Sequence, residues 1–122
     1  MRGIRGAITV PENSRQAILD ATVTLLGEMT EANDVTVEEL VSVLFTLTPD
    51  LNAAFPAEAA RQIGWTRVPL MCFQEVPVPG AMARVIRVLM LINREAPLSA
   101  MRHIYLGEAA SLRADLSEPG SA

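Results

Sequence analysis

Residues 2–10 alternate between large apolar side chains and small or polar ones. Ile4, Ile8 and Val10 fall on one face of an extended segment, and Arg5 falls on the other face among small neighbours. This period of two predicts a β-strand with one buried face. The small neighbours leave room for a partner beside Arg5.

A period of three to four residues follows, which is typical of an amphipathic helix. Its apolar stripe comprises Ile18, Ala21, Leu25, Met29 and Ala32. Asn13 and Ser14 are candidate N-cap residues because their short polar side chains can accept from the first free N–H groups. We predict a helix that runs from these residues to about Asn33 and packs on a sheet.

The rest of the chain predicts four more strands and a second, short helix. The strands are expected at residues 41–48, 68–73, 85–92 and 102–106. The helix is expected at residues 55–61, with Pro56 in its first turn and Gly64 as its stop. Residues 85–92 are apolar on both faces, so we expect a central strand that is covered on both sides. Intermixed strands and helices with short links predict an α+β fold.

Composition adds an expectation about assembly. The chain has 122 residues, enough for one domain, and 50% of them are hydrophobic, with a mean hydropathy of +0.28. So much apolar surface on so small a domain favours burial between subunits, since obligate interfaces resemble a core cut in half. We expect association into an oligomer.

The rarer residue types exclude several classes of protein. A single cysteine, Cys72, cannot form an intramolecular disulfide and fits a reducing compartment, and with one histidine it gives no zinc-binding pattern. The chain has neither a signal-peptide pattern nor the ~20 consecutive apolar residues of a membrane span, so we expect a cytoplasmic protein without membrane contact. A net charge of −4 argues against nucleic-acid binding.

Arg87 is the most unusual residue of the sequence. All ten basic residues are arginine, and Arg87 stands within an eight-residue apolar strand. A guanidinium that loses its hydration costs several kcal/mol unless it is paired. Its partner is either an acidic side chain, such as Glu75 or a carboxylate of a neighbouring chain, or a cluster of carbonyl groups, or an anionic ligand.

No nucleophilic or nucleotide-binding apparatus is visible. Cys72 has only His103 as a candidate base, and no glycine-rich phosphate loop follows a predicted strand. A small protein with arginines, a glutamate and a tyrosine suits a reaction that needs electrostatics and shape, without proton transfer, metal or cofactor.

The sequence resembles the monofunctional AroH-class chorismate mutases along nearly its whole length. The motifs, in order, are Arg2–Val10, Thr48-Pro49-Asp50-Leu51, Phe55-Pro56-Ala57, Val68-Pro69, Cys72, Gln74-Glu75, Ile86-Arg87-Val88, Arg102–Leu106 and Leu112–Leu116. Each fragment alone is weak, but the set together is specific. The resemblance implies a mixed β-sheet flanked by helices, related to the ferredoxin-like fold, and a homotrimeric pseudo-α/β-barrel with active sites between subunits.

The resemblance also implies an activity and its residues. The reaction is the cofactor-free Claisen rearrangement of chorismate to prephenate. The catalytic residues that it implies are Arg87 at the ether oxygen, Glu75 and Cys72 at the ring hydroxyl, and Arg5 at the side-chain carboxylate. The residues that it implies for binding are Tyr105, Phe55, Ala57, Arg61, Leu70, Met71, Leu112 and Arg113.

Two positions depart from the pattern of that family. Glu58 stands where the family carries Lys, and Met71 replaces a smaller, often polar residue. A trimeric enamine/imine deaminase and an amino-acid-binding regulatory module are the alternatives that also account for an interfacial arginine. We assign residues 1–116 to the enzyme domain and residues 117–122 to a flexible C-terminal tail.

Overall fold

A computed structural model describes residues 1–111 of the chain. The strands and helices are β1 (Arg2–Thr9), α1 (Arg15–Ala32), β2 (Leu40–Leu47), α2 (Pro56–Gln62), β3 (Leu70–Gln74), β4 (Val85–Ile92) and β5 (Ile104–Leu106). Short 3-10 turns occur at Val37–Glu39, Leu98–Ala100 and Gly107–Ser111. The strand predicted at residues 68–73 begins two residues later, at Leu70, and the one predicted from residue 102 begins at Ile104.

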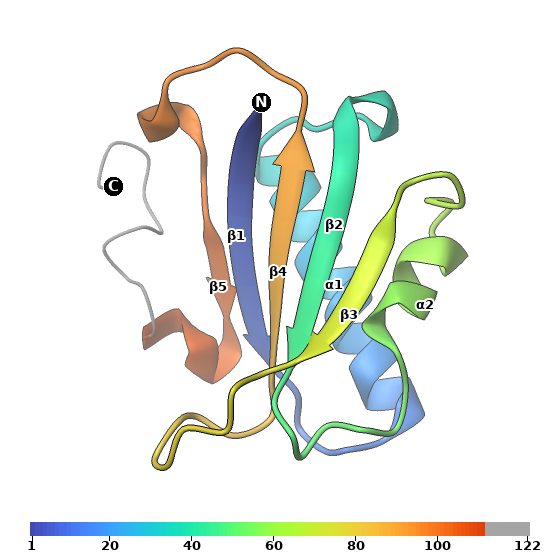
Figure 1. Cartoon of the computed structure of the whole chain (residues 1–122), viewed down its shortest axis with the longest axis vertical. Helices are drawn as coiled ribbons and strands as arrows, with labels where there is room; N and C mark the ends of the chain where they lie inside the picture. The colour runs from blue at the N-terminus through green and yellow to red at the C-terminus, as the bar shows by residue number, and fades with distance from the viewer. Residues whose placement is uncertain (112–122) are drawn as a thin grey trace.

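The five strands form one mixed sheet in the order β3-β2-β4-β1-β5. β4 is antiparallel to both β1 and β2, whereas the outer strands β5 and β3 run parallel to β1 and β2. Both helices lie on the same side of this sheet, behind it in Figure 1. The α+β prediction and the central place of β4 are confirmed.

The hydrophobic core lies between the sheet and α1. Ile4, Phe45 and Met90 from three neighbouring strands are fully buried, together with Leu25 and Met29 of the helix. The backbone of β1 approaches the helix so closely at Gly6 that an added Cβ would lie 2.4 Å from the sulfur of Met29. A larger residue at this position would therefore force the Met29 side chain to move.

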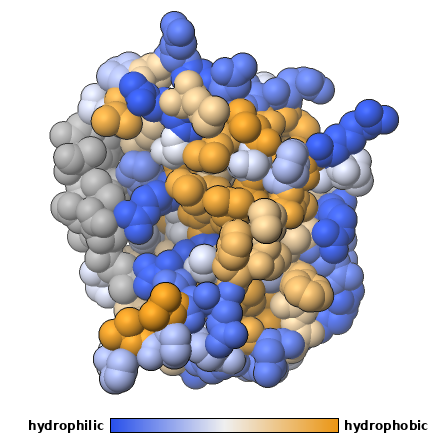
Figure 2. Space-filling model, in the orientation of Figure 1, coloured by the Kyte–Doolittle hydropathy of each residue, from blue (hydrophilic) through white to orange (hydrophobic). Residues whose placement is uncertain are grey.

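The second face of the sheet carries no α-helix of residues 1–111, and only the 3-10 turn Gly107–Ser111 covers part of it. Leu89 on the central strand is 37% exposed, and Met71 and Phe73 on β3 are exposed as well. Figure 2 shows an apolar stretch over the middle of this face. Within residues 1–111, the expectation that β4 is covered on both sides is therefore wrong at Leu89. We call this surface the open face of the sheet.

The ends of the helices follow the sequence signals in most details. Ser14 is the N-cap of α1, where its Oγ accepts from the Ala17 N–H at 3.1 Å. Asn13 instead joins the loop after β2, and its Oδ1 accepts from the Asn52 N–H at 3.0 Å. Ala32, which the predicted stripe included, is exposed because it belongs to the last turn beyond the sheet.

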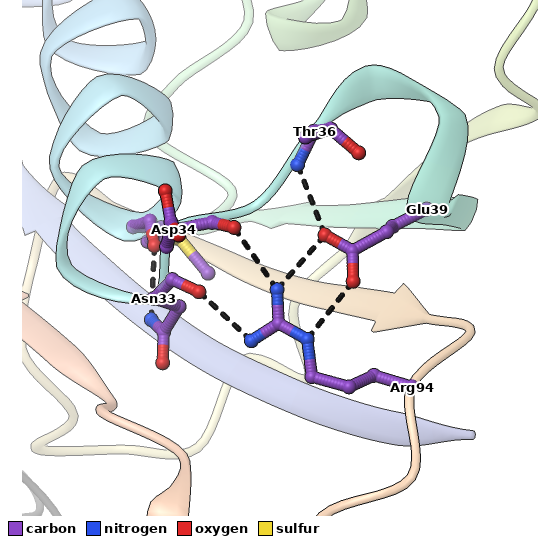
Figure 3. A network of polar contacts seen from close by, with 6 residues as sticks. Asn33, Asp34, Thr36, Glu39 and Arg94 are labelled. Atoms are coloured by element: carbon purple, nitrogen blue, oxygen red, sulfur yellow. Dashed lines mark hydrogen bonds and ion pairs between the residues drawn. The ribbon is translucent and has the colours of Figure 1, made fainter.

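The C-terminal end of α1 is tied to the chain after β4 by Arg94 (Figure 3). Its guanidinium donates to both carboxylate oxygens of Glu39, at 2.9 and 2.8 Å. It also donates to the backbone oxygens of Asn33 and Asp34, at 2.8 and 3.0 Å. A cation at this position is favoured because the last carbonyls of a helix carry partial negative charge.

Candidate active site

The register of the sheet places the central predicted residues in one row on the open face. Thr46 of β2 pairs with Arg87 of β4, Arg87 with Ala7 of β1, and Ala7 with Tyr105 of β5. Residues that are opposite each other on adjacent strands project from the same face. Arg87 and Tyr105 thus flank the methyl group of Ala7.

Arg87 contacts Glu75, as one of the alternatives from sequence anticipated. Its Nε lies 3.3 Å from Glu75 Oε2, and the two side chains are 30% and 26% exposed. Although the two atoms are close, their geometry does not make a hydrogen bond, and this buried Nε has no hydrogen-bond partner among residues 1–111. Arginine and carboxylate groups prefer two parallel hydrogen bonds. The observed pair is charged and close but leaves the donors of the guanidinium available.

Glu75 is held by two successive residues of β2. Its N–H donates to the Leu47 oxygen at 2.7 Å, and its Oε2 accepts from the Thr46 hydroxyl at 2.6 Å. Among residues 1–111, Glu75 Oε1 has no hydrogen-bond partner. One oxygen of the carboxylate is therefore fixed and the other is open to a ligand.

A cavity of about 250 Å³ surrounds this pair on the open face. Its lining residues are Arg5, Leu44, Thr46, Phe73, Glu75, Arg87, Val88 and Leu89. A second hollow of about 380 Å³, beneath the loop from Val76 to Ala83, also reaches Glu75 and Arg87. Two arginines and one carboxylate thus converge on a partly apolar cavity that suits a small anion.

Arg5 lies on β1, the strand next to Arg87, and Tyr105 lies on β5, one strand further. The Arg5 N–H donates to His103 Nδ1 at 2.9 Å, which ties β1 to the residue before β5. Tyr105 is 8% exposed and packs with Ala7, and within the described chain its buried hydroxyl finds no hydrogen-bond partner. A buried polar group without a partner costs free energy, so this hydroxyl is a candidate ligand-binding group.

A second group of predicted residues lies in a different pocket, of about 550 Å³, between β3 and the N-terminal end of α2. Phe55, Arg61 and Cys72 line this pocket. Burial raises the pKa of the Cys72 thiol, opposed by the Ala57 backbone and by the charge of Arg61. The Arg61 guanidinium makes no ion pair with residues 1–111, so it too is available to an anion.

Glu58, which departs from the family pattern, lies at the edge of this second pocket. Arg15 donates to both of its oxygens, in one case at 2.9 Å. These bonds, with the charges of Arg15 and Arg61, lower the pKa of Glu58. The negative charge of Glu58 is therefore compensated by Arg15, at the first turn of α1.

The two groups do not meet within one chain. Cys72 faces α2, whereas Glu75 comes after the end of β3 and faces Arg87, so the three-residue spacing keeps them on different sides. Ala57 is buried beneath the second pocket, Leu70 is half-buried against the core, and Met71 is exposed on the open face. Leu112 and Arg113 lie outside the described residues.

No pattern in the sequence indicates a role for Thr46 in the site. A threonine in a strand is common, since β-branched residues favour strands. Only the pairing of β2 with β4, which sets Thr46 beside Arg87, reveals that its hydroxyl contacts Glu75.

The described residues contain no group of three potential metal ligands. No helix within residues 1–111 has the length and apolar character needed to cross a membrane.

Comparison with known proteins identifies the family. The model of the family "Chorismate mutase type I" matches residues 1–116. A chorismate mutase AroH from Thermus thermophilus is 59% identical over 117 residues, 95% of this chain and 96% of the relative. A chorismate mutase AroH from Bacillus subtilis is 43% identical over 118 residues, 96% of this chain and 93% of the relative.

A solved structure agrees with these sequence matches. A chorismate mutase from Clostridium thermocellum superposes with a TM-score of 0.88 at 44% identity, over 89% of this chain and 97% of that one. Neither the deaminase nor the regulatory-module alternative is supported by these matches. The chain belongs to the type I chorismate mutase family and is an isomerase of that class.

Proposed function

We propose that this enzyme rearranges chorismate to prephenate, in aromatic amino acid biosynthesis, by electrostatic stabilisation at Arg87. The supporting observation is a guanidinium fixed on the open face whose Nε is buried without a hydrogen bond to residues 1–111. In the rearrangement the C–O bond breaks and negative charge grows on the ether oxygen. A donor that is already oriented toward this oxygen binds the transition state more strongly than the substrate, which accelerates the reaction.

Glu75, Arg5 and Tyr105 hold the substrate in its reactive conformer in this proposal. Glu75 Oε1 accepts from the ring hydroxyl, and its charge lies near the ring as the ring becomes positive. Arg5 and the Tyr105 hydroxyl bind the side-chain carboxylate. Fixing the folded conformer supplies part of the acceleration through proximity. No residue is required as an acid, a base or a nucleophile.

We further propose a homotrimer in which each site is shared by two subunits. Arg87, Glu75, Arg5 and Tyr105 come from the open face of one subunit, and Phe55, Arg61 and Cys72 from the second pocket of its neighbour. Two features support this proposal: the two groups face different pockets of one chain, and the open face is apolar. Exposed apolar patches of this kind typically mark interfaces.

An assay of the purified enzyme tests the activity. The enzyme is mixed with chorismate in the presence of a chelator and without cofactor, and prephenate is measured. We expect turnover in the wild type and its loss in Arg87→Ala. Arg87→Lys is also expected to be strongly impaired, because an ammonium cannot reproduce the planar fork of donors. Turnover that needs a metal or a nicotinamide, or a fully active Arg87→Ala, contradicts the proposal.

Mixing two inactive variants tests the shared site. Arg87→Ala and Arg61→Ala are unfolded together, refolded and assayed against each variant treated alone. In a closed ring, about a quarter of the sites receive an intact residue from each side if subunits assemble at random. We expect activity to return only in the mixture. Sites confined to one subunit give no recovery.

The remaining assignments stay predictions. They are the cytoplasmic location, the domain at residues 1–116 with the tail at residues 117–122, and the roles of Leu112 and Arg113. Sedimentation of the purified protein measures the oligomeric state directly.

A further inference from the structure

Thr46 connects two groups that the proposed mechanism uses separately. Its hydroxyl donates to Glu75 Oε2 at 2.6 Å, and this same oxygen lies 3.3 Å from Arg87 Nε. Thr46 is also the residue opposite Arg87 in the ladder between β2 and β4. One threonine thus fixes the carboxylate beside the catalytic arginine.

The geometry of the Glu75–Arg87 pair needs an explanation. A glutamate free to rotate next to an arginine forms two parallel hydrogen bonds with it, since that arrangement is the strongest. Here the contact is single, and it lacks the geometry of a hydrogen bond. Glu75 is held in this arrangement by the Thr46 hydroxyl on its side chain and by Leu47 on its backbone.

We propose that Thr46 is a positioning residue that prevents Glu75 from closing onto Arg87. This inference rests on the proposed function, because it assigns Thr46 a role in preparing both groups for chorismate. With Oε2 bound by the hydroxyl, Oε1 stays directed at the cavity and the guanidinium keeps its donors for the ether oxygen. Without the hydroxyl, the carboxylate turns and occupies those donors.

The first test compares Thr46→Val with Thr46→Ser. Valine has the shape of threonine and suits a strand but lacks the hydroxyl, whereas serine keeps the hydroxyl. We expect kcat to fall at least about tenfold in Thr46→Val with a smaller change in KM, as for loss of a hydrogen bond to a charged group. Thr46→Ser is expected to stay within about threefold of the wild type in kcat. Equal kcat in wild type and Thr46→Val overturns the inference, and so does a serine variant as impaired as the valine variant.

A double-mutant cycle separates positioning from a general structural effect. In a Glu75→Ala background there is no carboxylate to hold, so adding Thr46→Val is expected to change kcat less than about twofold. A full additional loss in that background contradicts the inference. Ser42→Ala is the matched control, because it removes a hydroxyl from the same strand and forms no hydrogen bond with any described residue. We expect wild-type turnover for this control.

A crystal structure of Thr46→Val tests the inference without any activity. We expect the Glu75 carboxylate to rotate and form two hydrogen bonds with Arg87. A carboxylate that stays in place overturns the role of Thr46, whatever the substrate. If the wild type does not convert chorismate but the carboxylate moves, then the proposed function fails and the positioning of Glu75 by Thr46 stands.

Discussion

The two ends of β4 each carry an arginine, and the two arginines differ in their hydrogen bonds. Arg94, just past the strand, has a side chain that is 25% exposed, and Arg87, near its start, has one that is 30% exposed. Their burial is therefore nearly the same. Arg94 donates four hydrogen bonds, whereas the Arg87 guanidinium donates none within residues 1–111. What separates a structural arginine from a candidate catalytic one is the state of its donors.

The difference arises from what surrounds each guanidinium. Arg94 meets two chain segments, namely the residues that follow α1 and the turn that precedes β2. The first supplies two carbonyls and the second a carboxylate. Arg87 meets the flat open face, where its neighbour in the row is Ala7. The backbone groups of the strands already form hydrogen bonds with each other, so they cannot accept from the Arg87 guanidinium. Its donors are therefore available to a ligand.

The largest expected effect on turnover comes from removing the charge of Arg87, the arginine without hydrogen bonds. Arg87→Leu is expected to lower kcat by at least about 10²–10³-fold, because one preorganised donor contributes ~3–4 kcal/mol. The melting temperature is expected to stay the same or rise, since a partly buried guanidinium whose ion pair with Glu75 includes no hydrogen bond is replaced by an apolar residue in an apolar strand. Calorimetry and the chorismate assay on the same sample test this. A large loss of stability would make Arg87 a structural residue like Arg94.

For Arg94, at the other end of β4, we expect a loss of stability with little loss of turnover. Arg94→Ala is expected to lower the free energy of unfolding by about 1–2 kcal/mol, because it leaves two helix carbonyls and a carboxylate without their donor. Turnover per folded molecule is expected to remain within about twofold, since the site lies at the far end of β4. Urea unfolding together with the activity assay measures both. Loss of turnover without loss of stability would contradict the comparison.

The pH dependence of stability sharpens the comparison further. The Arg94 side chain, and then the Thr36 backbone, lower the pKa of Glu39 to about 2. A carboxyl whose pKa is lowered in the folded state stabilises the protein above its unfolded pKa, and this contribution is lost as the pH falls toward 2. Between pH 4.5 and pH 2, wild type is expected to lose more stability than Glu39→Gln. Melting curves across this range measure it, and equal losses in the two proteins would exclude the contribution of Glu39.

The smallest effect is expected for the exposed pair of Arg15 and Glu58. The Arg15 side chain is 57% exposed, and exposed pairs contribute little to stability. Arg15→Ala is expected to leave the melting temperature unchanged. It also leaves Glu58 uncompensated beside Arg61, so the KM for chorismate is expected to rise and Arg15→Ala/Glu58→Gln to restore it. If neither variant changes the KM, Glu58 does not affect substrate binding.

The sequence predicted most of the fold because its signals are local. The strand over residues 85–92 is confirmed residue for residue, since a run that is apolar except for Arg87 lies between Arg84 and Asn93. Ser14 as the cap of α1 and Gly64 as the stop of α2 follow from backbone requirements, and Gly64 indeed has a φ of +100°. The error on β4 has a physical origin. An apolar pattern records that a surface is buried, but not whether the same chain covers it.

The candidate site was harder to predict from the sequence than the fold. The contact of Glu75 with Arg87 appeared among the alternatives, but the third member, Thr46, depends on strand register, which no local pattern gives. The same holds for the Arg94 network, which joins residues more than 50 positions apart. Roles carried over from the family remain predictions until variants are assayed.

Ala7 gives the row of polar residues a property that none of its reactive members provides. It is 1% exposed and stands between Arg87 and Tyr105 on the middle strand. A single methyl group thus sets the spacing between a cation and a phenol. A larger side chain at this point would press against Val85, Tyr105 and Ala109, the buried residues of the same cluster. The distance between two groups that are proposed to act on the substrate therefore depends on the smallest side chain of the row.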